Sequence, residues 1–165
     1  MQSIDLIRQN LETSTERTLL RIDDMREHAM VAPTPNGGGH TLWVLGHLAY
    51  VEGLITRSIM LGEPNPREAW KELFDGDDVS YEADEFPPFD EALEACRQSR
   101  RETLELLATL SEDDLDRKSE RCPEGLEDTF GTYRHCFQLV ADHWYMHRGQ
   151  LADARRAAGL DRMWF

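Results

Sequence analysis

A chain of 165 residues, 40% of them hydrophobic, is long enough to bury one core without disulfide staples, so we expect a single domain over residues 1–165. The formal net charge of −14 repels phosphate backbones and anionic lipid, which argues against nucleic acid and membranes as partners. The apolar runs are all shorter than the roughly 18 residues of a membrane span, the N-terminal residues lack a signal-peptide pattern, and the three cysteines fit no disulfide framework, so a cytoplasmic location is predicted.

The first predicted helix runs from Ser3 to about His28, where apolar or small side chains recur at alternating spacings of three and four. The segment that follows, 30–39, contains two prolines and three successive glycines, which no helix interior tolerates. It is therefore a predicted loop and a candidate rim for a pocket.

The second predicted helix runs from about His40 to Leu61. On a helical wheel His47 lies on the apolar face. His40 lies on the same face but seven residues earlier, about 10.5 Å along the axis, so one ion cannot be held by both histidines. Glu52 is about 140° from His47 on the wheel, and we interpret it as a surface or interhelical residue.

The second helix is followed by an acidic crossover, residues 62–88. The middle of this crossover, Pro66 to Phe74, is predicted to form a short helix whose two aromatic side chains face the core. Two further long helices come after the crossover. A third long helix is predicted from Asp90 to Leu110 and a loop over 118–128. Strand-like alternation is absent. Four long helices with longer connections after the first and second predict an all-α four-helix bundle.

The last predicted helix, Thr132 to Ala158, combines a core face with a candidate site. Its apolar residues share an arc of roughly 120° on the wheel, and His143 and His147 lie within that arc. Because they are four residues apart, their Cβ atoms should be about 5–6 Å apart, near enough for both rings to reach one metal ion. Arg148, near the edge of the arc, is expected at a pocket rim or paired with an acid.

Three inward histidines on two helices, His47, His143 and His147, form a candidate metal site. A single histidine on an apolar face is usually a packed side chain, and pairs at a spacing of four occur by chance. Three of them without an inward acid are more readily explained by a cation than by three separate hydrogen-bond arrangements. His28 and His135 are expected at the surface. His40 is either a contact at the mouth of a pocket or a structural residue at a helix end.

The stretches LWVLGHLAYVEG (Leu42 to Gly53) and DHWYMHRGQLADARR (Asp142 to Arg156) resemble the DinB-like superfamily, and so does LATLSEDDLD (Leu107 to Asp116). Matched position by position, the metal triad of that family falls on the three histidines selected above. The resemblance implies a four-helix bundle, often a homodimer, that binds a divalent ion such as zinc or nickel. It also implies that some members transfer a low-molecular-weight thiol and that others are hydrolases.

Two functions follow from these observations. The preferred one is an enzyme in which a divalent ion on the three histidines activates a water or a cofactor thiol, for S-transfer or hydrolysis of a small-molecule substrate. The sequence assigns no catalytic residue beyond the metal ligands. The alternative is a non-catalytic stress-response or binding module in which the metal is structural or absent.

Overall fold

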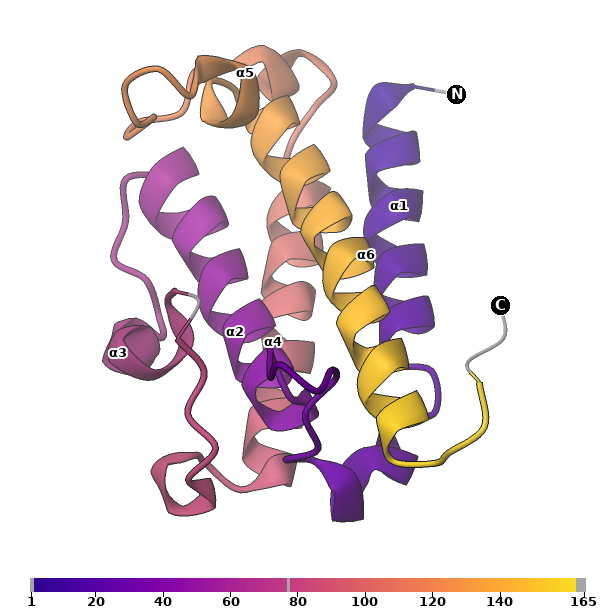
Figure 1. Cartoon of the computed structure of the whole chain (residues 1–165). Coiled ribbons are helices and arrows are strands. Elements are labelled where there is room, and N and C mark those ends of the chain that lie inside the picture. The colour runs from indigo at the N-terminus through magenta and orange to yellow at the C-terminus, as the bar shows by residue number, and fades with distance from the viewer. Residues whose placement is uncertain (1, 77, 163–165) are drawn as a thin grey trace.

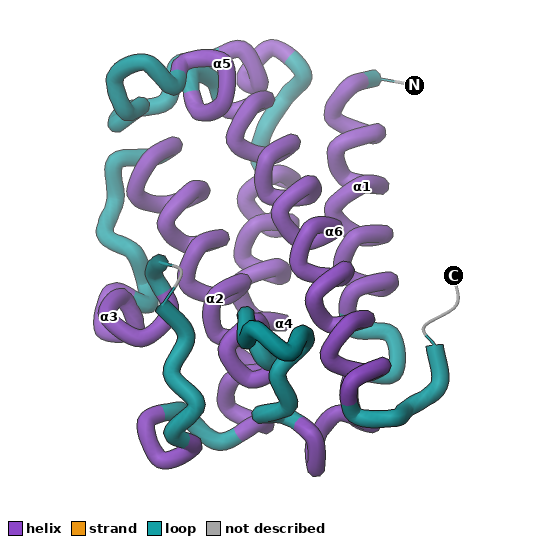
Figure 2. The backbone as a smooth tube through the Cα atoms, viewed as in Figure 1, coloured by secondary structure: helices purple, strands orange, loops and turns teal. Residues whose placement is uncertain are grey.

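The protein is all-helical in the part described by this computed structural model, residues 2–76 and 78–162, as the sequence predicted (Figure 1, Figure 2). Four long helices lie side by side within these described ranges (Figure 1). They are α1 (Ser3–Thr18), α2 (Thr41–Gly53), α4 (Phe89–Ala108) and α6 (Tyr133–Ala157). Short helical turns fill the connections: Ile22–His28, Glu68–Trp70, α3 (Lys71–Phe74), Ala83–Glu85, Asp113–Asp116 and α5 (Glu127–Phe130). No helix in the described ranges has the length and apolar character needed to cross a bilayer.

The first predicted helix is wrong in its second half. Helix α1 ends at Thr18, whose hydroxyl donates to the carbonyl of Trp144 at 3.2 Å. The chain then turns at Arg21, which has a positive φ of 58°, and continues as a 3-10 helix, Ile22–His28. The apolar spacing survives this break because Ile22 and Met25 are three apart, which places both on one side of a 3-10 helix as well.

Helix α2 and its extension lie where the sequence predicted them. His40 occupies the N-cap position, and a widened π-helical turn, Leu54–Met60, continues the element to its predicted end. Within α2 almost every residue is buried, because the helix packs against α4, α6 and the crossover. No face of α2 is therefore turned to solvent, and Glu52 is buried with the rest of the helix.

Glu52 is buried and interhelical, which is the second of the two positions expected for it, but the expectation of a core without an inward acid is wrong. Its carboxylate accepts from Arg100 Nε at 2.8 Å and from the indole N–H of Trp144 at 2.6 Å. Arg100 also donates to the carbonyl of Leu11 and to the hydroxyl of Ser14. This buried network joins α1, α2, α4 and α6, and satisfying each polar group offsets the cost of burying the charges.

The crossover packs its short helix on α2 through Phe74, which is fully buried as predicted. The ring of Phe74 covers Gly46, where an added Cβ would lie 2.1 Å from the ring. The sequence thus needs a glycine at position 46 so that α3 can approach α2.

Replacing Gly46 with alanine should therefore lower the free energy of unfolding by about 1–3 kcal/mol, because the ring of Phe74 must move out of a packed position. Denaturant unfolding followed by circular dichroism measures it. Gly149→Ala is the matched control: an added Cβ there meets nothing within 4 Å. Within a helix this change should raise stability by about 0.5–1 kcal/mol. Equal effects at both positions would contradict the packing argument.

Candidate metal centre

The structure brings together the three histidines predicted from the sequence. His47 comes from α2, and His143 and His147 come from successive turns of α6. The Nε2 atom of His143 lies 3.1 Å from Nε2 of His47 and 3.0 Å from Nε2 of His147. One ligand nitrogen from each ring falls within a mutual distance of 4.8 Å. The wheel argument for these three residues is therefore confirmed as far as their convergence is concerned.

Two of the rings are oriented by hydrogen bonds at their far nitrogens. Nδ1 of His47 lies 2.7 Å from the carbonyl oxygen of Phe74, and Nδ1 of His147 lies 2.8 Å from Oε1 of Gln150. An oxygen of this kind only accepts, so both Nδ1 atoms carry a proton, and in the neutral form of each ring Nε2 presents a lone pair toward His143. Partners of this kind fix the tautomer and orientation of metal-binding histidines.

Two of the nitrogen separations, both from His143, have the length expected between two ligands of one divalent ion. A single Nε2–H on His143 can donate to only one of its two neighbours, so at least one of the close nitrogen pairs would set two lone pairs against each other. A cation resolves that conflict. Two nitrogens each about 2.0–2.1 Å from one ion are roughly 2.8–3.4 Å apart for bond angles between 90° and tetrahedral, and both observed separations fall in that range.

Burial keeps the site in the form that binds metal. Loss of solvent, and then the neighbouring histidines, lower the pKa of His143 to about 2. Loss of solvent, and then His47, lower the pKa of His147 to about 4, although its bond to Gln150 acts in the opposite direction. Both imidazoles are therefore neutral at pH 7, which is the protonation state of a metal ligand.

The glycine-containing loop lies beside the three histidines, and its role as the rim of a pocket stays a prediction. The Trp43 ring stacks on His47 at 4.3 Å between centroids, with 18° between the planes. A Cβ added to Gly39 would lie 2.6 Å from that ring and 3.2 Å from Oε1 of Gln150. The backbone of the loop thus approaches two residues that support the histidines.

The structure decides between the two roles considered for His40. Its Nδ1 accepts from the backbone N–H of Trp43 at 3.1 Å, and its Nε2 donates to the carbonyl of Ser80 at 3.1 Å. His40 is fully buried and caps α2. It is the structural residue at a helix end, and it also ties the crossover to that end.

The remaining predicted residues lie outside the triad. His28 and His135 were expected at the surface, and both are partly exposed. Arg148 donates to the carbonyl of Arg17 at 3.2 Å, which is neither of the two expected roles. Sequence reasoning missed Gln150 and the carbonyl of Phe74 as supports for the histidines. Gln150 could have been found, since it lies three residues after His147 on the same helix face.

Acid should destabilise the metal-free protein through this site. The pKa values of His143 and His147 in the folded chain lie below the value of about 6.5 in the unfolded chain, so the unfolded chain takes up protons first as the pH falls. The stability is present above pH 6.5 and is lost below it, by up to about 1.4 kcal/mol per pH unit for each histidine.

Urea unfolding in the presence of chelator between pH 7 and pH 5 measures this dependence. The double variant His143→Gln, His147→Gln should show a flatter profile, while His40, whose pKa burial also lowers, is present in both proteins and cancels. Parallel profiles for the two proteins would contradict the expectation.

A family model for the DinB superfamily matches residues 10–151, which include all three histidines. Comparison with curated proteins and with solved structures gives no match.

Proposed function

We propose that this chain, which belongs to the DinB superfamily, is a divalent-metal-dependent enzyme whose four-helix bundle holds the ion on His47, His143 and His147. Its substrate is a small molecule, and the reaction is the transfer of a cofactor thiol or a hydrolysis. The observation that carries this proposal is the convergence of the Nε2 atoms of three histidines, two of which are oriented by partners at Nδ1.

The ligand count favours an enzyme over a structural metal site. A structural zinc site is closed by four protein ligands, whereas a catalytic site has three and leaves a position for water or substrate. The group found in residues 2–76 and 78–162 contains three. Glu52, the buried acid of α2, is held by Arg100 and Trp144, so its oxygens already have partners.

In the proposed enzyme the ion and the residues around it would have different roles. The ion, when bound, would supply positive charge that makes a water or thiol acidic near neutral pH. The Phe74 carbonyl and Gln150 accept hydrogen bonds from Nδ1 of His47 and Nδ1 of His147. These bonds orient the two rings so that both Nε2 atoms face the proposed ion. The Trp43 ring covers one face of His47 and shields it from water on that side.

Cobalt(II) spectroscopy tests whether the site is open. Cobalt-loaded protein titrated with 2-mercaptoethanol should develop a sulfur-to-cobalt charge-transfer band, and azide should change the visible spectrum, because both probes can enter the open position. The variant His143→Ala, loaded under the same conditions, is the control for cobalt bound elsewhere. Spectra that ignore both probes at millimolar concentration would show a closed site and would overturn the enzyme in favour of the structural alternative.

An open site then separates thiol transfer from hydrolysis in a substrate panel. Conjugation of a reactive electrophile by low-molecular-weight thiols and hydrolysis of activated esters are measured side by side, with and without chelator. The homodimer implied by the resemblance stays a prediction, which sedimentation of the metal-loaded protein checks.

A further inference from the structure

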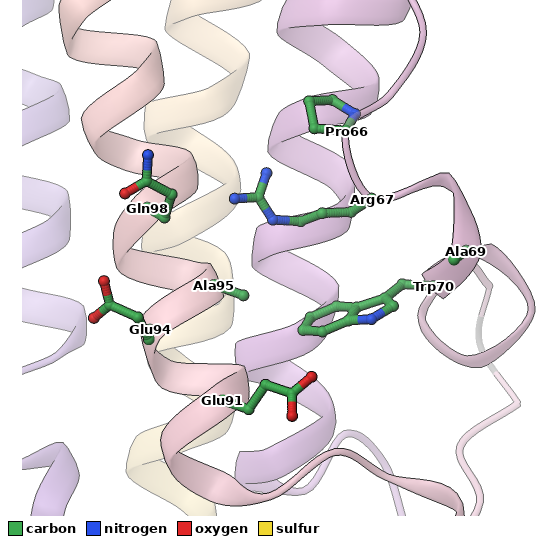
Figure 3. A pocket seen from close by; sticks show the side chains of 8 residues that line it. All are labelled: Pro66, Arg67, Ala69, Trp70, Glu91, Glu94, Ala95 and Gln98. Atoms are coloured by element: carbon green, nitrogen blue, oxygen red, sulfur yellow. The ribbon is translucent and has the colours of Figure 1, made fainter.

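A cavity of about 570 Å³ lies between the segment Pro66–Trp70 and helix α4 (Figure 3). Its lining contains none of the three histidines. Residues 91, 94, 95 and 98 of α4, which share one face of that helix, line one side of the cavity. Its volume falls within the roughly 300–1,000 Å³ of small-molecule sites.

The wall opposite α4 is anchored to the core. Asn65 donates to the carbonyl of Tyr50 at 3.1 Å and accepts from the backbone N–H of Arg67 at 3.0 Å. The ring of Trp70 packs against Phe74, with 5.0 Å between centroids. The cavity is therefore bounded by two supported walls, as expected of a preformed site.

The charges of the lining are unequal at the two ends. At one end Arg67, 12% exposed, pairs with Glu102 at 3.3 Å, and Gln98 donates to the same carboxylate at 3.1 Å. That end is neutralised. Toward the other end lies Glu91, whose side chain has no ion pair or hydrogen bond within residues 2–76 and 78–162. Glu94 has only an exposed pair with Arg101.

The Trp70 ring projects toward α4 between Arg67 and Glu91, with Ala95 on the facing helix (Figure 3). An indole ring attracts cations over its face, and a carboxylate without a partner adds a second attraction for the same charge. We propose that this cavity binds a small organic cation, an amine protonated at neutral pH with an aromatic or aliphatic body. The ammonium group lies over the face of Trp70 on the side toward Glu91, and the body lies on the rest of that face and on Ala95.

Titration of the full chain with phenethylamine, followed by NMR of the tryptophan indole N–H signals, tests the proposal. The Trp70 signal, assigned with Trp70→Leu, should shift on addition of the amine. The uncharged 2-phenylethanol, of the same size, should bind at least 5-fold more weakly. Equal affinity for the two probes would mean binding by apolar contact alone and would overturn the proposal.

Two substitutions on α4 distinguish binding of the amine by the Glu91 carboxylate from attraction by the overall negative charge of the protein. Glu91→Gln should weaken phenethylamine binding 3- to 10-fold, whereas Glu105→Gln, an exposed acid on the same helix outside the cavity, should leave it unchanged. Equal losses in the two variants would assign the binding to the overall charge of −14. Both positions are exposed, so neither change threatens the fold.

The proposal is independent of the metal centre. Phenethylamine should bind equally well with saturating zinc and with chelator, since the triad does not line the cavity. Binding that requires zinc would assign the amine to the metal and overturn the second site. A closed metal site in the cobalt experiment would leave this result unaffected.

Discussion

An Arg100→Met variant is expected to lose about 3–5 kcal/mol of its free energy of unfolding, the largest loss of stability predicted for this chain. The side chain of Arg100 is 2% exposed and that of Glu52 is 1% exposed. Removing the guanidinium leaves a buried carboxyl without its ionic partner. It also removes the donor to the hydroxyls of Ser14 and Thr15 and the cation stacked 4.2 Å over the Trp144 ring.

The double variant Glu52→Leu, Arg100→Met is the matched control, measured by urea unfolding like the single variant. Because it removes both charges and fills the volume with apolar groups, it should recover most of the loss, apart from the indole N–H of Trp144, which loses its acceptor. If the double variant is as unstable as the single one, the loss comes from packing and the ion-pair account is wrong.

Replacing any one of His47, His143 and His147 with alanine should weaken zinc binding by about 100-fold or more. The apparent binding free energy of roughly 10–16 kcal/mol for a four-ligand protein site corresponds to about 3 kcal/mol for each ligand, which is a little over two powers of ten. Competition with a chromophoric chelator measures the affinity of each variant.

Two further variants calibrate that result. Gln150→Leu keeps all three ligands but removes the acceptor for Nδ1 of His147, so we expect a smaller loss of 10- to 100-fold. His28→Ala removes a histidine outside the triad and should change nothing. A loss for His28→Ala as large as for the triad would show that the zinc is bound by scattered surface histidines.

Much of the fold was predictable because the sequence of helix α6 contains signals for both of its ends. Thr132, whose hydroxyl accepts from the backbone N–H of His135, caps the first turn, and the apolar arc continues to the C-terminal turn. The same arc correctly placed His143 and His147 next to the core. His47 followed from the second wheel, since α6 is one of the helices that α2 packs against.

The parts that were missed depend on tertiary contacts. A wheel treats polar positions as solvent-facing, but α2 is surrounded, so Glu52 and its partner Arg100 are both buried. The end of α1 at Thr18 was missed because apolar spacing does not separate an α-helix from the 3-10 helix that follows it. The carbonyl of Phe74 as a partner of His47 was missed because a backbone group carries no sequence signal.

The central claim, that imidazoles from α2 and α6 share one ion, is tested most directly by anomalous diffraction from crystals of the zinc-loaded protein. The account predicts one strong peak per chain, about 2.0–2.1 Å from Nε2 of His47, His143 and His147 alike. A peak held by only two of these rings, or by other side chains, would contradict it.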